Sequence, residues 1–88
     1  HNQMKQIYVL VEKEMYEDTV LVGASDSVDT LIELAETENE YRLKEDHDPY
    51  EVFYNTDPEG STYGENSIKS YPDVSSSRSY LIYPTKTV

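Results

Sequence analysis

Residues 7–36 read IYVLVEKEMYEDTVLVGASDSVDTLIELAE and decide the fold, because two apolar runs and an amphipathic segment follow one another. Residues 5–12 have the β-branched and aliphatic composition, and the length, of a strand. Residues 19–23 form a second apolar run after a polar turn, and we expect them to pair antiparallel with the first. The stretch therefore predicts a β-hairpin that leads into a helix.

The helix is predicted from apolar residues at positions i, i+3, i+4 and i+7, which are Val28, Leu31, Ile32 and Ala35. Ser25, Asp26 and Ser27 precede them and are candidate N-caps. We expect a helix of about three turns that ends near Asn39.

The second half of the chain contains further candidate strands. Residues 41–44 (YRLK) and 68–71 suit short extended pieces, and residues 50–55 (YEVFYN) alternate with Tyr50, Val52 and Tyr54 on one face. Residues 80–83 (YLIY) are the predicted final strand, which Pro84 ends. The order predicts an α+β fold: one mainly antiparallel sheet of four to five strands with a single helix packed on one face.

The length of 88 residues is sufficient for one small domain. Met4 follows His1, Asn2 and Gln3, which we expect to derive from an expression vector, so that residues 4–88 form the domain. The longest apolar run has five residues, from 7 to 11, which is too short for a membrane span or a signal peptide. The sequence therefore predicts a cytoplasmic protein without a membrane partner.

Acidic residues dominate the charge, with 18 Asp and Glu against seven Lys and Arg and a net charge of −11. Twelve of the acids and only two of the bases lie between residues 25 and 60. Such a surface repels phosphate, so we expect no direct binding of nucleic acid.

Within the predicted helix the acids advance by three and four residues, and at about 100° per residue they form one row. Its members are Asp26, Asp29, Glu33, Glu36 and Glu40. The following turn could extend the row with Glu45, Asp46, Asp48 and Glu51. The charges are spaced about 5 Å apart along the axis, close to the roughly 3.4 Å between phosphates of a DNA strand.

Two interpretations of this row stay open. The row is either a nucleic-acid mimic that occupies the basic groove of another protein, or a solvated helix face that only supports solubility. Because neighbouring carboxylates repel by a few tenths of a kcal/mol per pair, the row costs stability, and only Arg42 and Lys44 are near enough in sequence to offset it.

Tyrosine is the dominant aromatic residue, with nine copies against one phenylalanine. A tyrosine ring combines apolar area with a hydrogen-bonding hydroxyl, which suits a surface that recognises a partner. The candidates near predicted turns are Tyr16, Tyr41, Tyr50, Tyr63 and Tyr71.

Neither an enzyme nor a cofactor is expected. The chain has no cysteine and no nucleophile, dinucleotide or P-loop motif. His47 stands between Asp46 and Asp48, but a single imidazole in a turn is a weak metal signal, and we predict no metal.

Residues 7–36 also resemble the opening of short phage proteins, in which an IYVV-type strand leads to a VGxxxS turn and a helix. The size, acidity and lack of catalytic motifs are similar to phage-encoded inhibitors, including anti-CRISPR proteins, uracil-DNA glycosylase inhibitors and anti-restriction DNA mimics. The resemblance implies a non-enzymatic inhibitor that binds a host protein with a basic nucleic-acid-binding groove, in the cytoplasm of an infected bacterium. The alternative is a small phage structural or adaptor protein that binds a protein partner through tyrosine-bearing loops.

Overall fold

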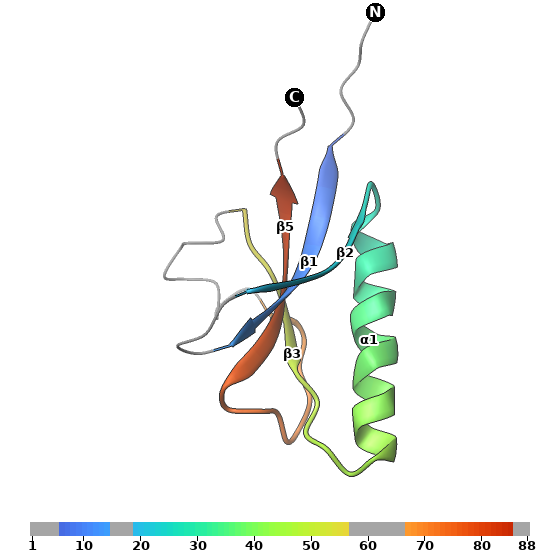
Figure 1. Ribbon diagram of the computed structural model, residues 1–88, viewed down its shortest axis with the longest axis vertical. Helices are drawn as coiled ribbons and strands as arrows, with labels where there is room; N and C mark the ends of the chain where they lie inside the picture. Colours follow the sequence, from blue (N-terminus) through green and yellow to red (C-terminus); the bar gives the residue numbers. More distant parts are fainter. Residues whose placement is uncertain (1–5, 15–18, 57–66, 86–88) are drawn as a thin grey trace, which may run out of the picture.

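The computed structural model describes residues 6–14, 19–56 and 67–85, which form five strands and one helix (Figure 1). In chain order these are β1 (Ile7–Glu14), β2 (Val20–Ser25), α1 (Val28–Lys44), β3 (Glu51–Tyr54), β4 (Ser67–Lys69) and β5 (Arg78–Thr85). The predicted α+β fold with one helix on one sheet is confirmed. The turn at residues 15–18, Tyr63 and the N-terminal residues 1–3 lie outside the described residues.

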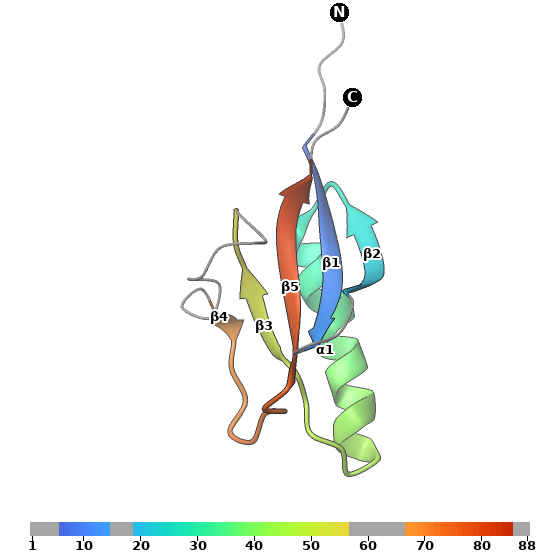
Figure 2. The ribbon, with the colours of Figure 1, turned by 60° about the vertical axis from the view of Figure 1, so that its left-hand side comes forward.

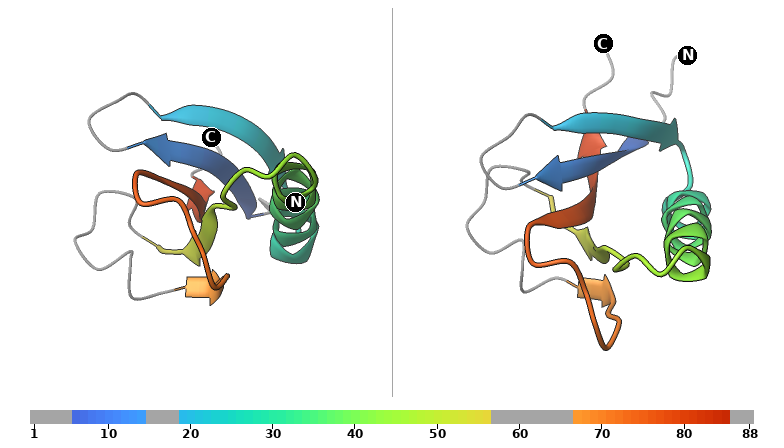
Figure 3. Two further views of the ribbon diagram at one scale, coloured as in Figure 1. Left: turned by 90° about the horizontal axis from the view of Figure 1, so that it is seen from below. Right: turned by 60° about the horizontal axis from the view of Figure 1, so that its bottom comes forward.

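The strands form one sheet in the order β2-β1-β5-β3-β4 (Figure 2). Three neighbouring pairs are antiparallel, and β3 pairs with β5 in parallel. The last strand of the chain therefore inserts between the first hairpin and β3. Since β2 and β3 point the same way, the segment from β2 through α1 to β3 is a crossover, which places α1 on one face of the sheet (Figure 3).

Apolar side chains are buried on both faces of the sheet. The face toward α1 carries the larger cluster, in which Leu31 and Ala35 of the helix pack on Leu10, Tyr50, Val52, Tyr80 and Ile82. The other face buries Val11, Phe53 and Leu81, with Val9 and Tyr83 packed beside them. The predicted common face of Tyr50, Val52 and Tyr54 is confirmed, since all three belong to the helix-side cluster or pack against it.

The helix begins where the sequence places its cap and lies close to β2. Ser27 is the N-cap, and its Oγ accepts a hydrogen bond from the Thr30 amide at 3.3 Å. A Cβ atom on Gly23 of β2 would lie 3.0 Å from Leu34 Cδ2, so the missing side chain lets the helix approach this strand. Gly23 therefore serves helix packing and needs no unusual backbone angle.

The prediction that the helix ends near Asn39 and that residues 41–44 form a strand is wrong, because α1 continues to Lys44. The last turn carries Arg42 and Lys44, whose charges favour the negative end of the helix dipole. Arg42 also continues the buried side of the helix, three residues beyond Asn39. These tertiary contacts outweigh the strand-like alternation of YRLK.

Pro84 does not end β5, which runs on to Thr85. The reason is that β3 accompanies β5 only as far as Ile82, while β1 continues alongside and pairs Tyr8 with Pro84. On the side without a partner, the missing amide proton of proline costs no sheet hydrogen bond.

The helix ends in a Schellman turn built on an aspartate. The amides of Asp46 and His47 donate to the carbonyls of Leu43 and Arg42 at 3.2 and 2.7 Å. Asp46 has a φ of 62°, the left-handed conformation that glycine adopts with less strain.

We therefore predict that Asp46→Gly stabilises the protein by about 1 kcal/mol and raises Tm by about 4–8 °C. Thermal unfolding followed by circular dichroism measures the change. The control is Asp48→Asn, which removes a nearby charge and should leave Tm almost unchanged. A fall in Tm for Asp46→Gly would contradict the backbone explanation.

Candidate functional site

The helix α1 presents four carboxylates on one flank, here called the acidic flank: Asp29, Glu33, Glu36 and Glu40. At about 100° per residue they share an arc of about 60°, and the row is about 16 Å long. Asp29, Glu33 and Glu40 are exposed, and Glu36 is half-buried. Asp26 is exposed just before the N-cap. In the described part of the chain, no ion pair or hydrogen bond engages the side chains of the acidic flank.

The turn after the helix is acidic as well. Glu45, Asp46 and Asp48 are all exposed, and they follow directly from the C-terminal end of α1 (Figure 1). Glu51 does not join them, because it alternates with the core residue Val52 and so points to the opposite face of the sheet. Its Oε1 accepts a hydrogen bond from Ser70 Oγ at 3.3 Å.

The predicted interface tyrosines are not one cluster. Tyr41 is 60% exposed, with the Lys44 ammonium 5.7 Å from its ring centre. Tyr71 is half-buried beside Lys69. Tyr50 lies in the core at 7% exposure, so its ring is not available as a surface contact. Tyr16 and Tyr63 lie outside the described residues.

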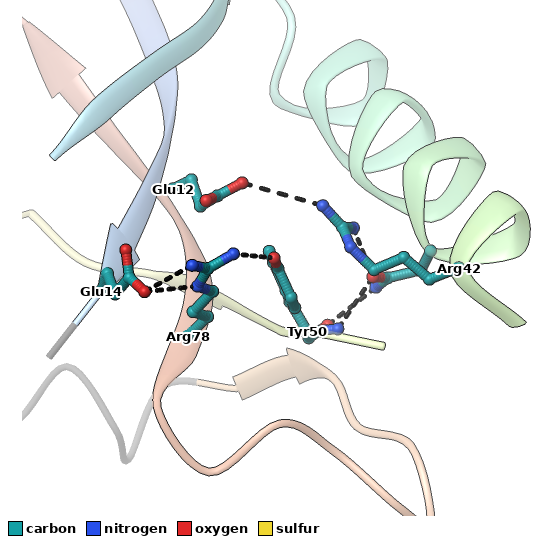
Figure 4. A network of polar contacts seen from close by, with 6 residues as sticks. Glu12, Glu14, Arg42, Tyr50 and Arg78 are labelled. Atoms are coloured by element: carbon teal, nitrogen blue, oxygen red, sulfur yellow. Dashed lines mark hydrogen bonds and ion pairs between the residues drawn. The ribbon is translucent and has the colours of Figure 1, made fainter. Parts of the chain in front are cut away.

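Two arginines occupy a network between the helix and the sheet (Figure 4). The Arg42 guanidinium carbon lies 3.6 Å from the centre of the Tyr50 ring, and Nη2 lies 3.7 Å from Glu12 Oε1. Arg78 contacts Glu14 Oε1 at 2.6 Å and donates to the Tyr50 hydroxyl at 3.2 Å. The hydrogen bonds to Tyr50 and Glu14 raise the pKa of the Arg78 guanidinium above its ordinary value.

This network changes the expected charge balance of the helix. Arg42 was expected to offset the carboxylates of its own helix, yet it pairs with Glu12 of β1. Arg78 is likewise directed to Glu14 of β1. Both arginines therefore pair with carboxylates of the sheet, and Lys44, at i+4 from Glu40, is the only base of α1 that remains beside the acidic flank.

Asn39 is the central polar residue of this region, and the sequence pattern did not reveal it. Its side chain is fully buried; Nδ2 donates to the Tyr50 carbonyl at 2.7 Å, and Oδ1 accepts from the Tyr50 amide at 2.8 Å. Arg42 Nη1 donates to the same Oδ1 at 3.0 Å. The side-chain amide of Asn39 thus pairs with both the N–H and the C=O of Tyr50, as the backbone of a neighbouring strand would. The signal for it was the position of Asn39, four residues after Ala35 on the buried side.

Two pockets flank Arg78, with volumes of about 360 and 470 Å³. Both include Glu14, Ser75, Ser77 and Arg78, and the larger one also includes His47. The Arg78 charge in both pockets is already held by Glu14. Across residues 6–14, 19–56 and 67–85, no three His, Asp or Glu side chains are grouped to hold a metal ion.

Comparison of the chain with protein-family models, with curated proteins and with solved structures finds no match. No helix within the described ranges is long and apolar enough to cross a membrane.

We predict that Asn39→Ala lowers the free energy of unfolding by about 2–4 kcal/mol, because it leaves the buried amide and carbonyl of Tyr50 without partners. Urea unfolding monitored by tyrosine fluorescence measures the loss. The control is Ser76→Ala, an exposed position in the loop before β5, which should change stability by less than about 0.5 kcal/mol. Equal effects at the two positions would show that Asn39 has no special role.

Alkaline pH should reveal the burial of Tyr80, which is 1% exposed. Burial raises the pKa of its hydroxyl above the ordinary value of 10.0, while Arg42 opposes this in part. Above pH 10 the unfolded chain therefore loses this proton first, so stability falls as the pH rises. Urea midpoints at about pH 8 and about pH 11 should differ less for Tyr80→Phe than for the wild type. An unchanged difference would contradict the prediction.

Proposed function

We propose that this protein is a non-enzymatic inhibitor that presents the acidic flank of α1, and the acidic turn after it, to the basic nucleic-acid-binding groove of another protein. Suitable targets are enzymes that bind nucleic acid through such grooves, for example a CRISPR effector or a DNA-repair or restriction enzyme. The binding free energy would come from charge pairing and from counterions released by the groove.

One observation carries this proposal: the acidic flank has no ion-pair partner among the described residues, while both arginines of the network pair with β1. A face that served only as a solvated surface would gain from nearby bases at i+3 or i+4. Here both arginines are directed elsewhere, and Lys44 is the only base of α1 at such a spacing, four residues after Glu40. The repulsion among Asp29, Glu33 and Glu36 therefore persists. Retained repulsion at one surface is the pattern expected when charge serves a partner rather than the fold.

The tyrosine-bearing adaptor surface has less support. Among its described candidates, Tyr50 is in the core and Tyr71 is half-buried, so only Tyr41 offers a largely exposed ring. A single exposed ring is a small basis for a partner interface, which usually centres on a cluster of buried anchors.

We predict that Glu33→Gln, Glu36→Gln and Glu40→Gln together weaken binding to the target while stabilising the fold. Removing three repulsive pairs should raise the free energy of unfolding by about 1 kcal/mol. Losing three charges should weaken displacement of target proteins from immobilised DNA at low salt by about tenfold or more. The assay loads a bacterial lysate on double-stranded DNA and measures the proteins that this chain releases.

The control for this triple variant is Ser67→Lys, Ser70→Lys and Asp73→Asn, three exposed positions on β4 and the loop after it. It changes the net charge by the same amount and leaves the acidic flank intact, so it should release the same proteins as the wild type. If the triple glutamine variant releases DNA-bound proteins as well as the wild type does, the proposed function is wrong.

A further inference from the structure

The edge strand β2 has the composition of an interior strand. Residues 19–25 read TVLVGAS and contain neither a charge nor a proline, in a chain with 25 charged residues among 88. Only the central strand β5 has an equally long uncharged run, at residues 79–85. The opposite edge, β4, has three residues and ends in Lys69. Short length and lysine are common protections of a sheet edge, and β2 has neither; its one irregularity is a bulge at Val22, opposite Leu10 and Val11.

Apolar side chains are exposed on both faces of this edge. Val20 is 56% exposed and Leu21 is 65% exposed. No other large apolar residue in the described part of the chain is as exposed as Leu21. Val20 pairs with Glu12 and Leu21 with Val11, so their side chains point to opposite faces of the sheet. A strand added at β2 would therefore extend both apolar layers at once.

One flank of α1 is uncharged as well. It consists of Thr30, Leu34, Thr37 and Tyr41, which share an arc of about 60° on the helix. Leu34 shows that this flank borders β2, since a Cβ atom on Gly23 would lie 3.0 Å from Leu34 Cδ2. Glu38, half-buried between this flank and the core, is the neighbouring carboxylate. The acidic flank is centred about 100° away, on the side of the helix that faces away from β2.

We propose that the β2 edge and this uncharged helix flank form the interface of a homodimer. Antiparallel pairing of β2 with β2 of a second copy, about a two-fold axis perpendicular to the sheet, joins the two sheets and keeps both helices on one face. The uncharged flanks then meet across the axis. This arrangement points both acidic flanks away from the axis, so the flank carboxylates of the two chains are not apposed although each chain has a net charge of −11.

Charge selects a second copy over another protein as the occupant of this edge. A partner recognised by this acidic chain through its charge would be basic, and it would be drawn to the acidic flank and not to an uncharged surface. Among the described strands β2 pairs only with β1, so its outer side combines backbone groups that have no strand partner there with apolar and hydroxyl side chains. This is a self-complementary set that suits an isologous contact.

The test is the molar mass of the purified 10.2 kDa chain, measured by sedimentation equilibrium over a concentration series. We expect about twice the monomer mass. We also expect association to tighten as salt increases from about 20 mM to about 500 mM, because salt screens the repulsion between the two chains. Groove binding under the proposed function weakens over the same range, so the two proposals can fail separately.

Two matched variants localise the interface. Leu21→Lys places a charge on β2 and should reduce the molar mass by about half. Ile68→Lys places the same charge on the opposite edge strand β4, where Ile68 is 39% exposed, and this variant should stay dimeric. Circular dichroism confirms that both variants fold, and Thr37→Glu on the helix flank should also dissociate the dimer. A monomeric wild type, or a dimeric Leu21→Lys variant, would overturn the proposal.

Discussion

The position of β3 depends on one buried contact, the pair of hydrogen bonds between the Asn39 amide and the backbone of Tyr50. After α1 the chain must return to the sheet and begin a strand at a point where no neighbouring strand supplies a partner. Asn39 provides that partner from the helix, and the Tyr50 ring then packs against Tyr80, with ring centres 5.1 Å apart. From this point Val52 and Phe53 enter the two apolar layers, one on each face. A side-chain amide thus sets the register of the parallel β3–β5 pair.

The same contact organises the positive charges. Asn39 Oδ1 holds Arg42, and the guanidinium is stacked on the Tyr50 ring and directed toward Glu12 of β1. Tyr50 in turn accepts from Arg78, which is paired with Glu14. One tyrosine therefore separates two arginines, with its ring facing one and its hydroxyl facing the other (Figure 4). Because both bases are held in this way, the outer carboxylates of α1 keep their mutual repulsion.

The hairpin, the helix start and the core face of the helix could be predicted from sequence because each depends on local pattern. Ser27 is a capping residue, and the apolar spacing from Val28 onward is helical whatever surrounds it. The end of the helix could not be predicted in this way. Residues 41–44 alternate like a strand, and their helical state depends on Tyr50 and Glu12, which are distant in sequence. The burial of Tyr50 follows from the same long-range contacts, whereas the orientation of Glu51 follows from the alternation of its strand.

A helix packed on a sheet needs only one apolar stripe, so burial leaves the rest of its surface free to vary. In α1 the remainder is divided, with carboxylates on one flank and threonine, leucine and tyrosine on the other. A requirement for solubility would be met by charges on either flank, and mixing them would reduce the repulsion among neighbours. Separation of the two classes has no benefit for the isolated monomer. The separation is explained if the two flanks of the helix meet different surroundings. The uncharged flank borders β2, which is the longer of the two edge strands in the described part of the sheet and carries no charge.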